Sequence, residues 1–158
     1  MTTQQLQEEE VVQRRRREGE EKEILLEYDG NLFAMEIIKD KLYTGGWDNK
    51  TKGKGGGIIK VMDLQSRSWS EIRTKSKGNI DALIGWKNGN IFASVYNSNT
   101  NSYTIEMINT HNFELCESYP TAEGSGVCLI EWRGYLVSAG GNDTINVWNT
   151  ELKSIKYI

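Results

Sequence analysis

Histidine, proline and cysteine are scarce in this chain of 158 residues, which holds one His, one Pro and two Cys. A disulfide-stapled domain or a structural zinc site needs more Cys and His than that. The sequence also lacks any apolar run of about 18 residues, so it predicts no membrane-spanning helix and no membrane partner. The net charge of −3 does not favour a strongly basic nucleic-acid binder.

The N-terminal residues lack the apolar centre of a signal peptide, so we expect a cytoplasmic or nuclear protein. Residues 1–23 alternate acidic and basic blocks, which predicts a charged tail that is disordered or forms a short helix. Arg14–Arg17 have the composition of a nuclear-import patch, with acidic residues on both sides. The sequence leaves open whether this cluster directs import.

Groups that carry catalysis or hold cofactors are also few. His111 lies in a turn with no nucleophile or carboxylate assigned to it. Residues 51–57 are rich in Lys and Gly, but a strand follows them where a phosphate-binding loop needs a helix. Cys116 and Cys128 are expected to be small core residues. In a propeller they would lie on an outer strand and on the inner strand of the next blade, too far apart for a disulfide. We therefore predict no catalytic residue, no metal site and no cofactor, and a protein that is not an enzyme.

From Ile24 onward, short apolar segments alternate with turn residues, which is typical of strands. Residues 34–48 and 128–142 match without a gap, and 82–94 fit with two extra residues in the turn. Four such strands recur about every 40–45 residues, which is typical of propeller blades. We predict an all-β fold, a partial β-propeller of about three four-stranded antiparallel blades. It spans residues 24–158, with repeats at about 31–77, 78–124 and 125–158.

The third repeat resembles the WD-repeat family in residues 136–149, Leu-Val-Ser-Ala-Gly-Gly-Asn-Asp-Thr-Ile-Asn-Val-Trp-Asn. Asn149 stands where the family dipeptide has Asp, and Met62-Asp63 keeps the Asp without the Trp. The short first hairpins are similar to those of F-box WD-repeat adaptors and of plant WD-repeat proteins with CCCH zinc fingers. The chain shows neither an F-box region nor a CCCH set, so neither role is transferred.

The resemblance implies a buried hydrogen-bonded cluster of Trp, Ser or Thr, Asp and His in each blade. The family His is missing in every repeat, so we expect incomplete clusters. It also implies that the first strand of each blade lines the central channel, where Ala34, Ala82 and Cys128 share one register. The positions assigned to the clusters are Thr44, Asp48, Ser94, Ser138, Asn142 and Trp148.

By the same resemblance, the loops between second and third strands emerge on one face of the propeller. We expect this face to bind other proteins, which predicts a non-catalytic interaction scaffold or a substrate-recruiting module. The alternative is an RNA- or nucleic-acid-associated protein that uses the lysine- and glycine-rich loop 50–57. The predicted contact residues are Trp47, Lys50, Lys52, Lys54, Tyr96, Asn97, Asn99 and Asp143.

Two plainer interpretations stay open: Trp47 folds over the blade edge, and the Asn-rich loop is only a long turn. Three blades also leave two open flanks, because propellers usually close with about four to eight blades. We therefore expect missing blades, a partner protein or further copies of this chain to complete the ring.

Overall fold

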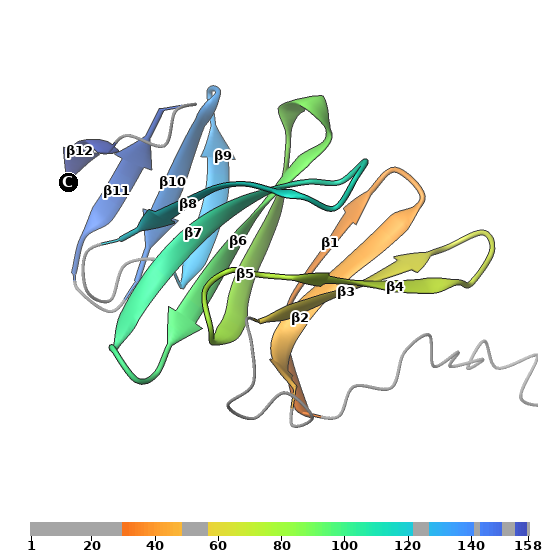
Figure 1. Ribbon diagram of the computed structural model, residues 1–158. Helices are drawn as coiled ribbons and strands as arrows, with labels where there is room; N and C mark the ends of the chain where they lie inside the picture. The colour runs from red at the N-terminus through yellow and green to blue at the C-terminus, as the bar shows by residue number, and fades with distance from the viewer. Residues whose placement is uncertain (1–29, 49–56, 122–126, 141–142, 150–153, 158) are drawn as a thin grey trace, which may run out of the picture.

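The computed structural model describes residues 30–48, 57–121, 127–140, 143–149 and 154–157. They form three four-stranded antiparallel sheets, so the predicted all-β, partial β-propeller fold is confirmed (Figure 1). The predicted tail 1–23 lies outside these residues, and the repeat boundaries stay predictions. No helix in the described part is long and apolar enough to cross a membrane.

Each sheet is one blade, and its strands follow one another in chain order. Blade 1 consists of β1 Gly30–Ile38, β2 Lys41–Asp48, β3 Ile58–Asp63 and β4 Trp69–Arg73. Blade 2 consists of β5 Asn79–Trp86, β6 Asn90–Asn97, β7 Ser102–Asn109 and β8 Leu115–Pro120. Blade 3 consists of β9 Cys128–Trp132, β10 Tyr135–Ala139, β11 Ile145–Trp148 and β12 Ser154–Tyr157.

The first hairpin of each blade is tight. Two turn residues separate the paired ends of β1 and β2, and again those of β9 and β10. The second blade turns through the 3₁₀ segment Lys87–Gly89, which is one residue longer. The prediction of two extra turn residues was therefore wrong. As a result, Ser94 is one residue further along its strand than the position of blade 2 that is equivalent to Thr44 and Ser138. Its side chain therefore points to the other face of its sheet.

The interface between blades 1 and 2 is mostly aliphatic. Tyr43, Ile59 and Val61 of blade 1 pack against Ile91 and Ile108 of blade 2, and all five are buried. Paired residues in an antiparallel sheet point to the same side, so these side chains define the facing sides of the two blades. Their burial is the main source of stability for this contact.

A buried carboxyl group closes the same interface. Glu106 is fully buried, and its two carboxyl oxygens accept hydrogen bonds from the backbone N–H groups of Lys75 and Ser76, at 2.9 and 2.6 Å. These two residues belong to the connection between β4 and β5. Gly78 ends that connection with φ +151, and a Cβ there would lie 1.7 Å from the Tyr96 carbonyl oxygen. Only glycine fits at this crossing.

The interface between blades 2 and 3 is richer in aromatic side chains. Phe92 and Ile105 pack with Leu129, Leu136 and Trp148. Edge-on contact between the rings of Trp86 and Phe92, with centroids 5.0 Å apart, extends the cluster. This second cluster joins blade 3 to blade 2.

Both cysteines contradict the prediction that they are core residues. Cys116 on the outer strand β8 and Cys128 on β9 are free and exposed. Cys116 lies on an outermost strand, which no described element covers. Cys128 occupies the same register as Ala34 and Ala82, but on the side of blade 3 that faces away from blade 2.

Candidate functional site

The second strand of every blade ends on the same edge of the arc. In Figure 1 the ends of β2, β6 and β10 all lie on the lower side, and the first hairpins lie on the upper side. We call this edge the second-strand edge. It comprises the described residues at the ends of these strands and just after them: Trp47, Tyr96–Ser102, Asp143 and Thr144. The residues predicted to contact partners therefore share one edge, as far as they are described.

An aromatic pair forms the centre of this edge. The Tyr96 and Tyr103 rings, on adjacent strands, have centroids 4.9 Å apart. The Tyr96 hydroxyl donates to Asn101 Oδ1 at 2.9 Å, and the Tyr103 hydroxyl donates to Asp81 Oδ2 at 2.9 Å. A tilted ring contact and hydrogen bonds thus fix both phenol rings.

The Asp81–Tyr103 pair is partly desolvated. Burial raises the pKa of Asp81, and the hydrogen bond from Tyr103 opposes this with a smaller effect. Burial also raises the pKa of Tyr103 well above its usual range, and the hydrogen bond and charge of Asp81 add to the shift. Both shifts favour the neutral forms, because a buried charge loses its hydration.

The turn after Tyr96 presents amides. Asn97 is half-buried, and its Oδ1 accepts a hydrogen bond at 3.0 Å from the backbone N–H of the exposed Asn99. Trp47, half-buried, ends the second strand of blade 1, and Asp143, exposed with φ +56, follows that of blade 3. Lys50, Lys52 and Lys54 lie outside the described residues. The edge therefore offers an aromatic centre with hydrogen-bonding groups around it.

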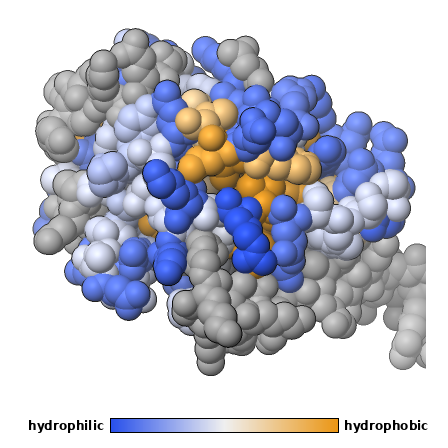
Figure 2. Space-filling model, in the orientation of Figure 1, coloured by the Kyte–Doolittle hydropathy of each residue, from blue (hydrophilic) through white to orange (hydrophobic). Residues whose placement is uncertain are grey.

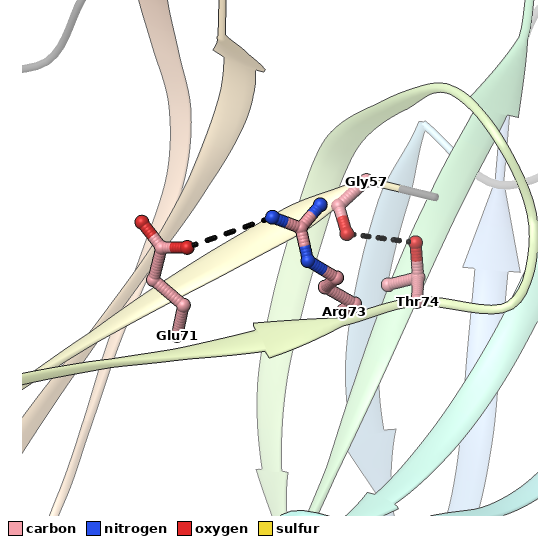
Figure 3. A network of polar contacts seen from close by, with 4 residues as sticks. All are labelled: Gly57, Glu71, Arg73 and Thr74. Carbon is pink, nitrogen blue, oxygen red and sulfur yellow. Dashed lines mark hydrogen bonds and ion pairs between the residues drawn. The ribbon is translucent and has the colours of Figure 1, made fainter. Parts of the chain in front are cut away.

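A row of cations, which the sequence prediction missed, lies where the lysine-rich loop returns to the blade. Arg73, Lys75 and Lys77 are exposed, whereas Thr74 between them is buried. The Thr74 hydroxyl lies 3.1 Å from the Gly57 carbonyl oxygen, which anchors the row beside the end of that loop (Figure 3). Arg73 also contacts Glu71 at 3.9 Å, a long and solvent-exposed ion pair (Figure 3).

The cluster positions implied by the WD-repeat resemblance differ between blades. In blade 3 the Trp148 indole N–H donates to Ser138 Oγ at 2.9 Å in a buried position. In blade 1 the Thr44 hydroxyl lies 3.4 Å from the Lys60 carbonyl oxygen. Ser94 Oγ is buried and has no hydrogen-bond partner among the described residues. Asn142 and the Asp48 side chain lie outside them.

The described side chains are placed for hydrogen bonding and stacking. No group of three or more His, Cys, Asp or Glu side chains in the described ranges could hold a metal ion. His111 is exposed in the turn after β7, on the opposite edge from Tyr96, and lies against Gly89.

Asp81 and Tyr103 escaped the sequence analysis, although two signals point to them. Asp81 interrupts the apolar run from Ile80 to Ile84, and a carboxyl in such a run needs a buried partner. Tyr103 is the antiparallel partner of Tyr96 across a short hairpin. For the cationic row, the signal was the alternation of basic and small residues over 73–77.

No family model matches this chain, and no curated protein matches it. Solved structures share its fold at low sequence identity. The computationally designed protein Ika8 matches with a TM-score of 0.61 and 16% identity, over 85% of this chain and 39% of that one. The designed Ika4 matches with a TM-score of 0.62 and 15% identity, over 85% of this chain and 78% of that one.

BamB from Moraxella catarrhalis, a β-propeller, matches with a TM-score of 0.54 and 12% identity. The match covers 82% of this chain and 34% of that one. This chain thus spans about two fifths of the length of Ika8 and a third of that of BamB. These likenesses support the propeller fold.

Proposed function

We propose that this protein is a non-catalytic interaction scaffold or substrate-recruiting module of the WD-repeat type, which binds other proteins through the second-strand edge. The proposal depends on one observation: the second strands of three blades end on the same edge, with Trp47 and Tyr96 near the ends of β2 and β6 and Asp143 in the connection after β10 (Figure 1). Loops held by a rigid scaffold are where binding residues concentrate.

The composition of the edge suits a protein partner. Tyr and Trp supply a large contact area at a low cost in side-chain entropy, and they are enriched among the residues that dominate binding energy. The hydrogen bond to Asn101 and the tilted ring contact with Tyr103 already order Tyr96. A partner therefore loses little free energy to ordering this side chain.

A second candidate function rests on the cationic row. Arg73 at the end of β4 and Lys75 and Lys77 in the bent connection to β5 are all exposed, so three positive charges lie close together in the chain. Gly57, where the described chain resumes after the loop with Lys50, Lys52 and Lys54, is bonded to this segment. Such an array suits phosphate contacts along RNA or another nucleic acid.

Affinity capture with the full chain tests the first candidate. Tyr96→Ala and Trp47→Ala are expected to weaken binding of the captured protein by about tenfold or more, with little dependence on salt. Tyr96→Phe keeps the ring and is expected to retain most of the binding. Lys87→Ala, an exposed change on the opposite edge, is the control. Equal binding by all four variants, with unchanged thermal unfolding, would rule this edge out.

Salt titration against single-stranded RNA tests the second candidate. If the cationic row binds phosphates, Lys75→Gln with Lys77→Gln lowers the slope of log K against log salt by about 0.7 per lysine. Lys87→Gln leaves the slope unchanged. A shallow slope in the unaltered chain that neither change affects would contradict nucleic-acid binding there.

A further inference from the structure

Among the described residues, blades 1 and 3 each expose apolar side chains on one face, although Thr44 and Met62 on that face of blade 1 are buried. In blade 1, the face directed away from blade 2 carries Met35, Ile37 and Leu42, which share a side with Met62 and Trp69 through strand pairing. We call these five residues the front flank. Met35, Ile37 and Trp69 on it are exposed.

In blade 3, the face directed away from blade 2 is also apolar. Strand pairing places Ile130, Trp132, Tyr135, Val137 and Ile145 on it, and we call these residues the rear flank. All but Val137 are exposed. Figure 2 shows one apolar patch in the upper middle of the view, with hydrophilic side chains around it; in the same orientation, blade 3 lies to the left of this patch (Figure 1).

The rear flank of blade 3 is equivalent to the face of blade 2 that blade 3 covers. Counted from Ala82 and Cys128, Ile84 and Trp86 of blade 2 occupy the positions of Ile130 and Trp132. In blade 2 both are at least partly buried in the contact with blade 3, whereas Ile130 is 53% and Trp132 50% exposed.

The third strands show the same contrast. Ile105 of blade 2 is 0% exposed, and Ile145 at the equivalent position of blade 3 is 45% exposed. The residue types on the rear flank are therefore those of a covered blade face.

The front flank has positions equivalent to those with which blades 2 and 3 contact the preceding blade. Met35 occupies the position of Leu83 in blade 2 and of Leu129 in blade 3. Those two leucines are 8% and 7% exposed because a preceding blade covers them, but Met35 is 68% exposed. The chain thus carries both halves of its own inter-blade contact, one at each end of the arc.

We propose that a second copy of this chain covers both flanks, with the rear flank of each copy on the front flank of the other. The contact would continue the two inter-blade interfaces that the chain already forms. Two copies of three blades make six, the one multiple of three within the usual range of about four to eight. A head-to-tail contact of this kind forms a closed ring when its rotation permits.

The solution mass and the two free cysteines test this ring together. The full chain is expected to behave as a species of twice 18.0 kDa in sedimentation equilibrium. Cys128 lies on the same side of blade 3 as the rear flank, and Cys116 lies on the outer strand β8. Both are exposed in the single chain. In the ring, a thiol reagent is therefore expected to label Cys116 and to spare Cys128.

Two variants separate a head-to-tail ring from other dimers. Ile37→Asp places a charge on the front flank and Ile130→Asp places one on the rear flank. Because each contact uses one flank of each kind, either variant alone is expected to weaken dimerisation by about 100-fold or more. Mixed together, they restore one intact contact, between the rear flank of the first and the front flank of the second. The mixture is therefore expected to dimerise more tightly than either variant alone.

Several results would overturn the proposal. A monomer at all concentrations, with Cys128 labelled as fast as Cys116, would assign the flanks to another occupant, such as a different protein or further blades. Dimerisation that survives either single variant would indicate a symmetric flank-to-same-flank contact. Growth into large assemblies would show that the head-to-tail contact does not close. None of these results bears on the second-strand edge.

Discussion

The two inter-blade interfaces differ in the side chains that pack between the blades. Between blades 1 and 2, aliphatic side chains do most of the packing, and Glu106 holds the backbone of the connecting segment. Between blades 2 and 3, aromatic rings take a larger part in the packing, and the Trp148 indole N–H donates to Ser138 Oγ. Ser94 and Asn146 also bury side-chain atoms that have no hydrogen-bond partner within the described ranges.

The difference between the two interfaces indicates which blade separates first when the protein unfolds. Glu106 links the first interface to the main chain, because two N–H groups of the connection depend on its carboxyl oxygens. The second interface is described by packed side chains, and the unpaired buried polar atoms of Ser94 and Asn146 each cost free energy. We therefore expect blade 3 to open before blade 1 separates from blade 2.

The largest expected effect comes from truncating the aromatic centre of the second interface. Phe92 is fully buried, so Phe92→Ala is expected to destabilise the protein by about 3–5 kcal/mol. Amide hydrogen exchange should accelerate in β9–β11 and change little in β1–β3. Equal acceleration in blades 1 and 3 would break the distinction between the interfaces.

Removing the buried carboxyl tests the first interface. Glu106→Ala leaves two buried N–H groups without their acceptor, with an expected loss of about 2–3 kcal/mol in chemical denaturation. Glu106→Gln keeps the shape and one acceptor oxygen, so its loss should be about half as large. If both variants unfold like the unaltered chain, Glu106 does not hold the connection.

The indole–hydroxyl bond of blade 3 is expected to contribute less. Ser138→Ala leaves the Trp148 N–H buried without its acceptor, at a cost of about 1–2 kcal/mol. When Trp148→Phe is already present, the same change should cost much less, because no donor is left to satisfy. A double-mutant cycle measures this difference, and a coupling of zero would contradict the bond.

The smallest expected effect concerns pH. Because burial raises the pKa of Asp81, the folded state favours its neutral form. The stability this form contributes is fully present below the unfolded pKa, about 4, and is lost as the pH rises through the raised folded pKa. Asp81→Asn is expected to flatten the stability profile in that window, and Asp143→Asn, an exposed change, should not. Identical profiles for Asp81→Asn and the unaltered chain would contradict the shift.

Much of the fold follows from alternation and recurrence in the sequence. Third-strand apolar runs recur with landmarks at Met62, Ile108 and Trp148, so the strands of three blades could be predicted. The face of the sheet to which each side chain points is harder to predict, because it depends on the exact turn length. One turn residue fewer than expected places Ser94 on the opposite side of its sheet, away from the cluster position assigned to it.

Contacts between blades could not be predicted from strand patterns. Glu106 sits in an ordinary alternating strand, and its role depends on a connection that is about 30 residues away in sequence and passes beside it. Cys128 has the small size of a core position, yet it is exposed because its face is the uncovered side of blade 3. Such features depend on what lies across the sheet, which local sequence does not encode.

We propose that the second-strand edge binds partners, whereas the side chains of the strands pack the blades together. Hydrogen-exchange footprinting of the full chain with its captured partner tests this directly. We expect protection of the amides in the turn from Asn97 to Ser102 and around Asp143, with the opposite-edge turns at Lys87–Gly89 and Arg133–Gly134 unchanged. Protection confined to that opposite edge would contradict it.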